Sequence, residues 1–304
     1  MASALDHPEV AGLLAAASYA DVGVDTTTGP HVTPAAFAAA SNRIWLVSSR
    51  RTVRVRAVRR TGHAAVLVRD GDRALLVSGR AQVLSLWSAR EARALLSGTA
   101  PATRAAATYA LRNARSVLSG FVADVLSGGG DLNVQDRVLI AVDADRGVAL
   151  DGERITHSWG RWRRRATPAL RPKQATTAAP SLRVLLGGVP PAVTRSLHRD
   201  AGVSLGWSTP QGCVVLPAAC ADVERERLHV SAALLEAVGA RSGAAACATV
   251  HRSLGRRPSG FRGVVARGTA RVVARGALRA TVSLRADRMS WWSGYESGTT
   301  RAAA

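Results

Sequence analysis

The sequence is short of the residues that several kinds of site require. Its 304 residues include three cysteines, none of them in a C-x-x-C pair, and Lys173 is the only lysine. Three widely spaced thiols argue against a disulfide framework or a zinc site and favour reduced cysteines. The seven histidines form no ligand pair, so we expect no metal site.

Long apolar runs and a targeting leader are also absent. No apolar stretch approaches the roughly 20 residues that a membrane-spanning helix needs. The N-terminus lacks a basic segment ahead of an apolar run, which a secretory signal would have. We therefore expect a cytoplasmic protein with no membrane partner.

Positive charge is abundant. The chain has 41 basic and 21 acidic residues, for a formal net charge of +20. A GC-rich genome explains arginine use in general, whereas attraction of an anionic partner explains it where arginines cluster. Single-strand binders interleave basic with aromatic residues, and aromatics make up only 4% of this chain, so nucleic acid is a poor candidate. A small-molecule substrate is the expected partner.

Short apolar segments between turn residues predict a mainly β first half. Strands are expected at Tyr19–Val24, His31–Phe37, Arg43–Ser48, His63–Arg69, Ala74–Leu84 and Arg137–Val142. Helices are expected at 5–17 and from Thr52 to Arg60. Helical spacing at about 88–130 predicts a helical insertion. Residues 163–180, rich in Arg, Pro, Thr and Ala, predict a linker between domains.

The second half repeats the first. Gly268 to Val272 follows the pattern of Gly79 to Val83. Arg279 to Arg288 aligns without a gap on Arg137 to Arg146, and both end in Ala-Asp-Arg. The repeat predicts two similar β domains about a pseudo-twofold axis, which would make the monomer a pseudo-dimer.

A basic cluster follows the third expected strand. This strand ends in Ser48 and Ser49, and four of the seven residues from Arg50 to Arg56 are arginines. Hydroxyls, guanidiniums and the N–H groups of a helix start together suit a phosphate ester. We interpret the segment as the phosphate grip of a flavin-type cofactor.

The order and spacing of four segments resemble the pyridoxamine 5'-phosphate oxidase-like proteins, the flavin- and deazaflavin-binding split barrels. The segments are Val32-Thr33-Pro34, Ile44 to Ser49, Arg54 to Arg60 and Leu76 to Val83. The resemblance implies a mainly β fold with helices: two tandem six-stranded antiparallel split barrels forming a pseudo-dimer. The expected domains are 1–162, with the helical insertion, and 181–304, a degenerate second barrel.

The resemblance also implies where a cofactor would bind. The implied contacts are Val32, Thr33 and Pro34 along the isoalloxazine ring, and Ser48, Ser49, Arg51 and Arg54 at the phosphate. Ala57 replaces the family's usual asparagine, which removes one expected hydrogen bond. His31 borders the ring-binding strand. We expect it to cap a turn at the surface; the alternative is a hydrogen bond to a cofactor or substrate. Catalytic residues stay unknown, because hydride transfer through a bound flavin needs no protein acid or base.

The basic cluster does not recur in the second half. There His229 to Ala237 takes its place, keeps Ser231, has no arginine and adds Glu236, whose carboxylate would repel a phosphate. We therefore expect one cofactor site per chain, with the second barrel as a wall that completes it. Trp291 is expected to cover the ring, with ordinary packing as the alternative.

These observations predict an FMN-dependent oxidoreductase. One alternative is an F420-dependent reductase, because a basic groove suits the acidic tail of F420. Another is a split barrel that no longer catalyses and serves as a binding or regulatory module, which includes haem binding. The sequence does not specify the physiological substrate.

Overall fold

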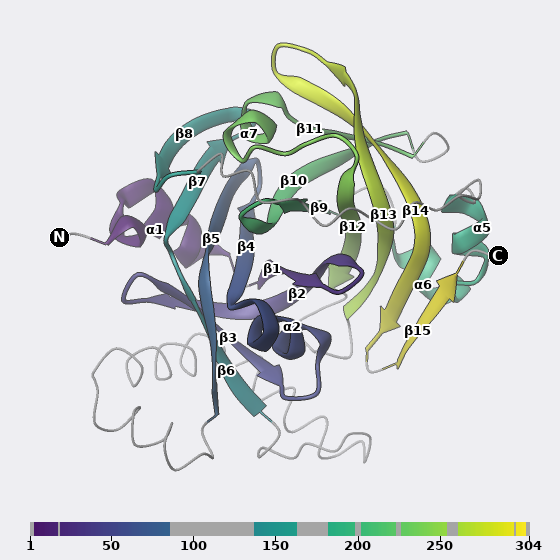
Figure 1. Ribbon diagram of the computed structural model, residues 1–304, viewed down its shortest axis with the longest axis horizontal. Coiled ribbons are helices and arrows are strands. Elements are labelled where there is room, and N and C mark those ends of the chain that lie inside the picture. Colours follow the sequence, from purple (N-terminus) through teal and green to yellow (C-terminus); the bar gives the residue numbers. More distant parts are fainter. Residues whose placement is uncertain are drawn as a thin grey trace.

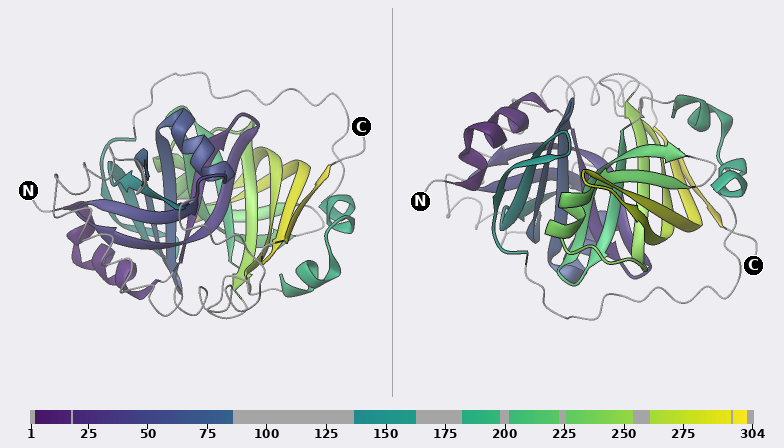
Figure 2. Two further views of the ribbon diagram at one scale, coloured as in Figure 1. Left: turned by 90° about the horizontal axis from the view of Figure 1, so that it is seen from below. Right: turned by 90° about the horizontal axis from the view of Figure 1, so that it is seen from above.

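Two antiparallel β-barrels lie side by side in the computed structural model (Figures 1 and 2). The structure describes residues 3–17, 19–85, 137–162, 182–197, 202–222, 226–253, 261–294 and 296–301. The helical insertion expected at about 88–130 and the linker expected at 163–180 lie outside the described residues.

The first barrel is built from the strands that the sequence predicts. They are β1 (Tyr19–Thr26), β2 (Gly29–Ala40), β3 (Arg43–Ser49), β4 (His63–Asp70), β5 (Arg73–Ser85) and β6 (Arg137–Asp143). Their order is β4-β1-β2-β3-β6-β5, and β5 pairs again with β4, so the sheet closes. Closure leaves these strands without a free edge. Two further strands, β7 (Arg146–Asp151) and β8 (Arg154–Trp159), extend the sheet from β5.

The second barrel has the same strand order. Its strands are β9 (Val203–Thr209), β10 (Gly212–Asp222), β11 (Arg227–Ser231), β12 (Ala244–Ser253), β13 (Phe261–Arg275) and β14 (Arg279–Ser293), with β15 (Glu296–Arg301) added beside β14. The order β12-β9-β10-β11-β14-β13, closed by β12, matches that of the first barrel strand for strand. The expectation of two six-stranded antiparallel barrels is confirmed.

Helices are short and lie outside the barrels. They are the 3-10 helix η1 (Ala4–Asp6), α1 (Pro8–Ala16), α2 (Val53–Thr61), α5 (Leu182–Gly187), α6 (Pro191–Ser196) and α7 (Ala232–Ala237). The single helix expected at 5–17 is wrong in one respect. His7 is extended, with φ −58° and ψ 132°, because a residue before proline avoids the helical region. Among the residues that the structure describes, no helix is long and apolar enough to cross a membrane.

Gly79 and Gly268 occupy the same place in the two barrels. A Cβ on Gly79 would lie 2.0 Å from the carbonyl oxygen of Asp143, and one on Gly268 would lie 1.8 Å from that of Arg285. Asp143 and Arg285 are themselves aligned in the repeat. At both sites two backbones therefore approach so closely that only glycine fits.

The barrels meet along β1 and β9. Asp21 on β1 accepts a hydrogen bond from Ser204 on β9, and Asp25 accepts one of 2.9 Å from Ser208. The repeat places Asp21 opposite its own equivalent, so a pseudo-twofold axis runs between the two strands. The aliphatic core of the second barrel continues into the first through this interface; Val32 of β2 belongs to it. The barrels thus form one packed unit.

Candidate anion and cofactor site between the barrels

The start of α2 gathers the predicted hydroxyls. Thr52 caps the helix, since its Oγ1 accepts the N–H of Val55 at 3.3 Å. Ser48, which is buried, shares a hydrogen bond of 3.0 Å with Thr52, and Ser49 Oγ accepts the N–H of Arg51 at 3.4 Å. Both serines were predicted from the sequence, whereas the capping role of Thr52 was not.

Arg54 joins α2 to the strand predicted to line the cofactor ring. Its Nη2 donates to Thr33 Oγ1 at 2.5 Å, to the Thr33 carbonyl at 3.2 Å and to the Pro34 carbonyl at 3.1 Å. The side chain is almost fully buried. Three of the predicted site residues are thus in direct contact.

The other predicted residues are more dispersed. Val32 is fully buried between the barrels, whereas Arg51 is exposed. Trp291 is on β14, where strand alternation gives it the same face as the buried Met289 and the opposite face from Arg288. Its covering role stays a prediction.

Two arginines of the second barrel join the site. Arg267 on β13 donates to Nδ1 of His31, and Arg288 on β14 donates to Thr28 Oγ1 at 2.7 Å. We call Arg54, Arg267 and Arg288, gathered around His31, the arginine cluster. His31 is half-buried in β2, so its expected role as a surface turn cap is wrong.

The arginine cluster makes this region strongly positive. Burial, followed by the charges of Arg267, Arg54 and Arg288, lowers the pKa of His31 to about 3. Burial also lowers the pKa of Arg267; the charge of Arg288 adds to this effect, and Cys247 and Asp287 oppose it. Such crowding of cations is unfavourable unless an anion offsets it.

Unsatisfied donors point to the same conclusion. The Nε atoms of Arg267 and Arg288 are buried and have no hydrogen-bond partner. Within the described ranges, neither guanidinium forms a salt bridge. A buried donor without an acceptor costs about 1–3 kcal/mol. These residues therefore fit a phosphate, whose oxygens accept several charge-assisted hydrogen bonds.

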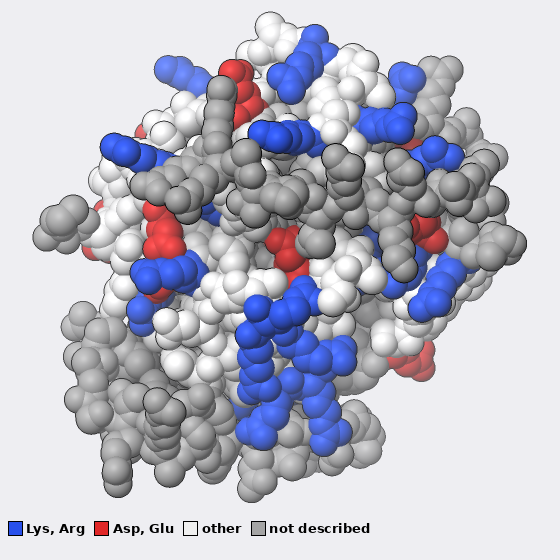
Figure 3. Space-filling model, viewed as in Figure 1, with Lys and Arg blue, Asp and Glu red and all other residues white. Residues whose placement is uncertain are grey.

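More arginines surround the exposed side of α2. Figure 3 shows basic side chains gathered around the position of this helix. The exposed ones are Arg50, Arg51, Arg56, Arg59 and Arg60. Negative charge that extends beyond a phosphate would meet this surface next.

The place related to the arginine cluster by the pseudo-twofold axis, which we call the second region, is built differently. Arg146, the counterpart of Arg288, donates to Gln211 Oε1 at 2.6 Å and to Ser78 Oγ at 3.1 Å, and stacks on Trp162 at 4.6 Å. Gln211 is in the turn that corresponds to the turn of Thr28. Arg146 thus donates to the side chains of both Gln211 and Ser78, whereas Arg288 donates to that of Thr28.

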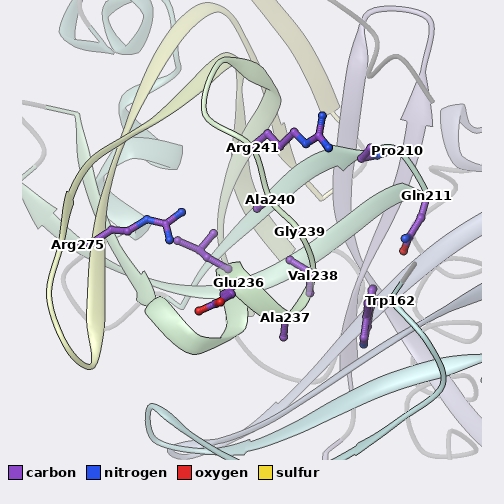
Figure 4. A pocket seen from close by; sticks show the side chains of 11 residues that line it. Trp162, Pro210, Gln211, Glu236, Ala237, Val238, Gly239, Ala240, Arg241 and Arg275 are labelled. Atoms are coloured by element: carbon purple, nitrogen blue, oxygen red, sulfur yellow. The ribbon is translucent and has the colours of Figure 1, made fainter. Parts of the chain in front are cut away.

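A cavity of about 540 Å³ adjoins this second region, and Figure 4 shows its lining. Trp162 and Gln211 form one side, and the chain from Leu235 to Arg241 forms another, with Glu236 in it. No arginine comes from α7, whose sequence is AALLEA. Arg241 and Arg275 also line the cavity, so the contrast with the arginine cluster is confined to the helix itself.

The comparisons with known proteins are limited to folds. No family model and no curated protein matches the sequence. A pyridoxamine 5'-phosphate oxidase-related, FMN-binding protein from Nostoc punctiforme is 11% identical and is matched over 50% of this chain and 87% of that chain, with a TM-score of 0.36. A conserved hypothetical protein from Mycobacterium tuberculosis is 19% identical over 48% and 85%, with a TM-score of 0.35. An F420 reductase is 15% identical over 45% and 93%, with a TM-score of 0.29.

Each of the three matches covers about half of this chain, and each TM-score is below 0.5. The assignment of the fold therefore rests on the strand pairing itself. By that pairing the chain is two six-stranded antiparallel barrels of the split-barrel type, each with the same strand order, and about half of it is similar to pyridoxamine 5'-phosphate oxidase-like proteins.

Proposed function

We propose that the chain binds one phosphate-bearing flavin-type cofactor at the arginine cluster and acts as an FMN-dependent oxidoreductase. The observation that carries the proposal is the convergence of three guanidiniums, those of Arg54, Arg267 and Arg288. The buried Nε donors of Arg267 and Arg288 lack acceptors. The cofactor, when bound, would supply the hydride-transfer chemistry. The protein would hold the phosphate with guanidiniums from both barrels.

The other predicted contacts belong to this proposal. Ser48, Ser49 and Arg51 would complete the phosphate grip at the start of α2, and the strand of Thr33 and Pro34 would lie along the ring. Arg54 is fixed to this strand by three hydrogen bonds, so it links the two parts of the site.

The deazaflavin F420 is the second candidate. The exposed arginines around α2 favour it, because they extend the positive surface beyond the arginine cluster. An acidic tail would be drawn to such a surface, and the attraction would weaken as salt rises. FMN ends at its phosphate and has no acidic tail, so the affinity for FMN would depend less on salt concentration.

The test is a titration of purified protein with FMN, riboflavin, F420 and haem, in which binding is measured by absorbance and fluorescence. FMN is expected to bind at least tenfold more tightly than riboflavin, since a charge-assisted hydrogen bond contributes about 1.5–3 kcal/mol. Arg288→Ala should remove most of this preference. Arg146→Ala, at the equivalent position of the other barrel, is the matched control and should keep it.

The outcomes separate the candidates. Tighter binding of F420 than of FMN, with strong salt dependence, would replace FMN by the deazaflavin. A protein that binds haem alone would be a non-catalytic module. If none of the four ligands binds, or if Arg146→Ala and Arg288→Ala weaken FMN equally, the proposed site is wrong.

A further inference from the structure

His31 is in contact with groups that can only donate hydrogen bonds. An N–H of Arg267 points to its Nδ1, and a guanidinium has no acceptor. Nδ1 must therefore carry a lone pair, which places the ring proton on Nε2. A protonated ring would set one N–H against another. The contact fixes both the charge and the tautomer of His31.

The charges that face His31 come from three elements. Arg267 is on β13, Arg288 is on β14 and Arg54 is on α2. All three lower the pKa of His31, after burial, to about 3. The imidazole is therefore neutral across the physiological range, although an unperturbed histidine titrates near pH 6.5.

We infer that the arginine cluster binds a dianion together with a proton, which His31 takes up. The inference rests on the proposed anion grip, and it concerns the class of ligand that this grip selects. A dianion would accept the N–H of Arg267 and so release Nδ1 of His31. It would also offset two of the three positive charges. The freed Nδ1 then takes a proton from solvent, and the imidazolium faces an anion.

This coupling distinguishes dianions from monoanions. A phosphate monoester or a sulfate offsets two of the three guanidinium charges and so weakens the repulsion that an imidazolium would meet, whereas a carboxylate offsets only one. Sulfate is the cleanest probe, because its own charge stays constant between pH 5 and 8. Any proton that is taken up on binding must then be bound by a group of the protein and not by sulfate.

The experiment is calorimetric titration of the full chain with sodium sulfate at pH 6.0, in two buffers of different ionisation enthalpy. Wild type should take up a substantial fraction of one proton per sulfate, and its affinity should rise several-fold from pH 7.5 to 5.5. One coupled proton limits this rise to tenfold per pH unit. His31→Gln, which keeps hydrogen-bonding groups without titrating, should bind sulfate with no uptake and a flat pH profile.

His63→Gln is the matched control. His63 is also held neutral beside an arginine, since Arg146 Nη2 lies 3.2 Å from its Nε2, but it belongs to the second region. This variant should keep the wild-type uptake. Nitrogen NMR of the wild-type imidazoles gives an independent reading: His31 should be neutral without sulfate and an imidazolium with it at pH 6.0.

Sulfate that binds without proton uptake, or with the same uptake in His31→Gln, would overturn this inference and leave the proposed cofactor site intact. Failure of both sulfate and FMN to bind would remove the proposed site itself. Binding of sulfate with uptake, but not of FMN, would keep the dianion grip and refute the flavin.

Discussion

Asp21 on β1 accepts a hydrogen bond from Ser204 on β9, the residue at the equivalent position of the second barrel. A dimer of identical barrels would place Asp21 opposite a second aspartate, and two buried carboxylates repel each other. Serine on one side replaces the repulsion with a hydrogen bond. Arg69, at 2.7 Å, and His251, at 2.6 Å, complete the contacts of this carboxylate. The interface is therefore adapted to two unlike halves.

Removal of the Asp21 carboxylate should destabilise the whole molecule. Asp21→Ala leaves the half-buried charge of Arg69 without its carboxylate partner, and breaking a buried ion pair costs about 3–5 kcal/mol. The measurement is urea unfolding followed by circular dichroism. The control is Asp70→Ala, which breaks the exposed pair with Arg73 and should cost at most about 1 kcal/mol. Equal losses in the two variants would contradict the buried network.

Acid should weaken the fold in two separate pH windows. Burial, followed by the charge of Arg146, lowers the pKa of His63 to about 4. The unfolded chain then binds the proton first, so this contribution is complete above pH 6.5 and is lost as pH falls to 4. Burial would raise the pKa of Asp21, but His251, Arg69 and Ser204 outweigh it and lower the value to about 2. That contribution is lost between pH 4 and 2.

From the size of the shifts, the His63 contribution is about 3 kcal/mol and the Asp21 contribution about 2 kcal/mol. Unfolding free energies at pH 7, 4.5 and 2.5 would measure them. His31, whose pKa is lowered to about 3, also contributes to the first window. His63→Gln should therefore reduce the loss in the first window without abolishing it, and Asp21→Asn should reduce the loss in the second. A wild-type stability that stays constant from pH 7 to 4.5 would refute the first assignment.

Alanine should be tolerated very differently at three glycines. At Gly79 and Gly268 the added Cβ would meet a backbone carbonyl at 2.0 and 1.8 Å, so strands must separate, at a cost of about 2 kcal/mol or more. Gly12, exposed within α1, has no atom within 4 Å of the added Cβ. Gly12→Ala should instead stabilise by about 0.5–1 kcal/mol. Thermal unfolding of the three variants tests the sign of each change.

The cap of α2 is a further test. Thr52→Ala removes the acceptor for the N–H of Val55 and the partner of Ser48, and should cost about 1 kcal/mol. Thr52→Ser keeps the hydroxyl and should behave as wild type in chemical unfolding. If serine is as harmful as alanine, the methyl group rather than the hydroxyl matters here.

Local signals explain what the sequence could predict. Alternation and the turn at Asp70-Gly71-Asp72 define neighbouring strands, and Arg54 follows its strand by only five residues. These features are determined by residues that lie close together in the sequence. The first barrel and the α2 part of the candidate site were accessible for that reason.

Contacts between the barrels were not accessible in the same way. Arg267 meets His31 from 236 residues away, and Arg288 meets Thr28 from 260 residues away. The second barrel was expected only to complete the cofactor site as a wall. Which of its side chains reach the site depends on how the two barrels pack, and a sequence pattern does not determine this. One signal did exist: the repeated Ala-Asp-Arg ends in Arg146 and Arg288, which both bind a β-hairpin turn of the other barrel.

Because both barrels belong to one chain, ligand affinity should not depend on the concentration of the protein. In a dimer, a site shared by two subunits is lost when the subunits dissociate, so ligand affinity falls on dilution. Here β2 and β13 belong to the same polypeptide, and their proximity does not depend on how many molecules are present. A ligand held between Arg54 and Arg288 should bind equally well to a protein that is scarce in its cell.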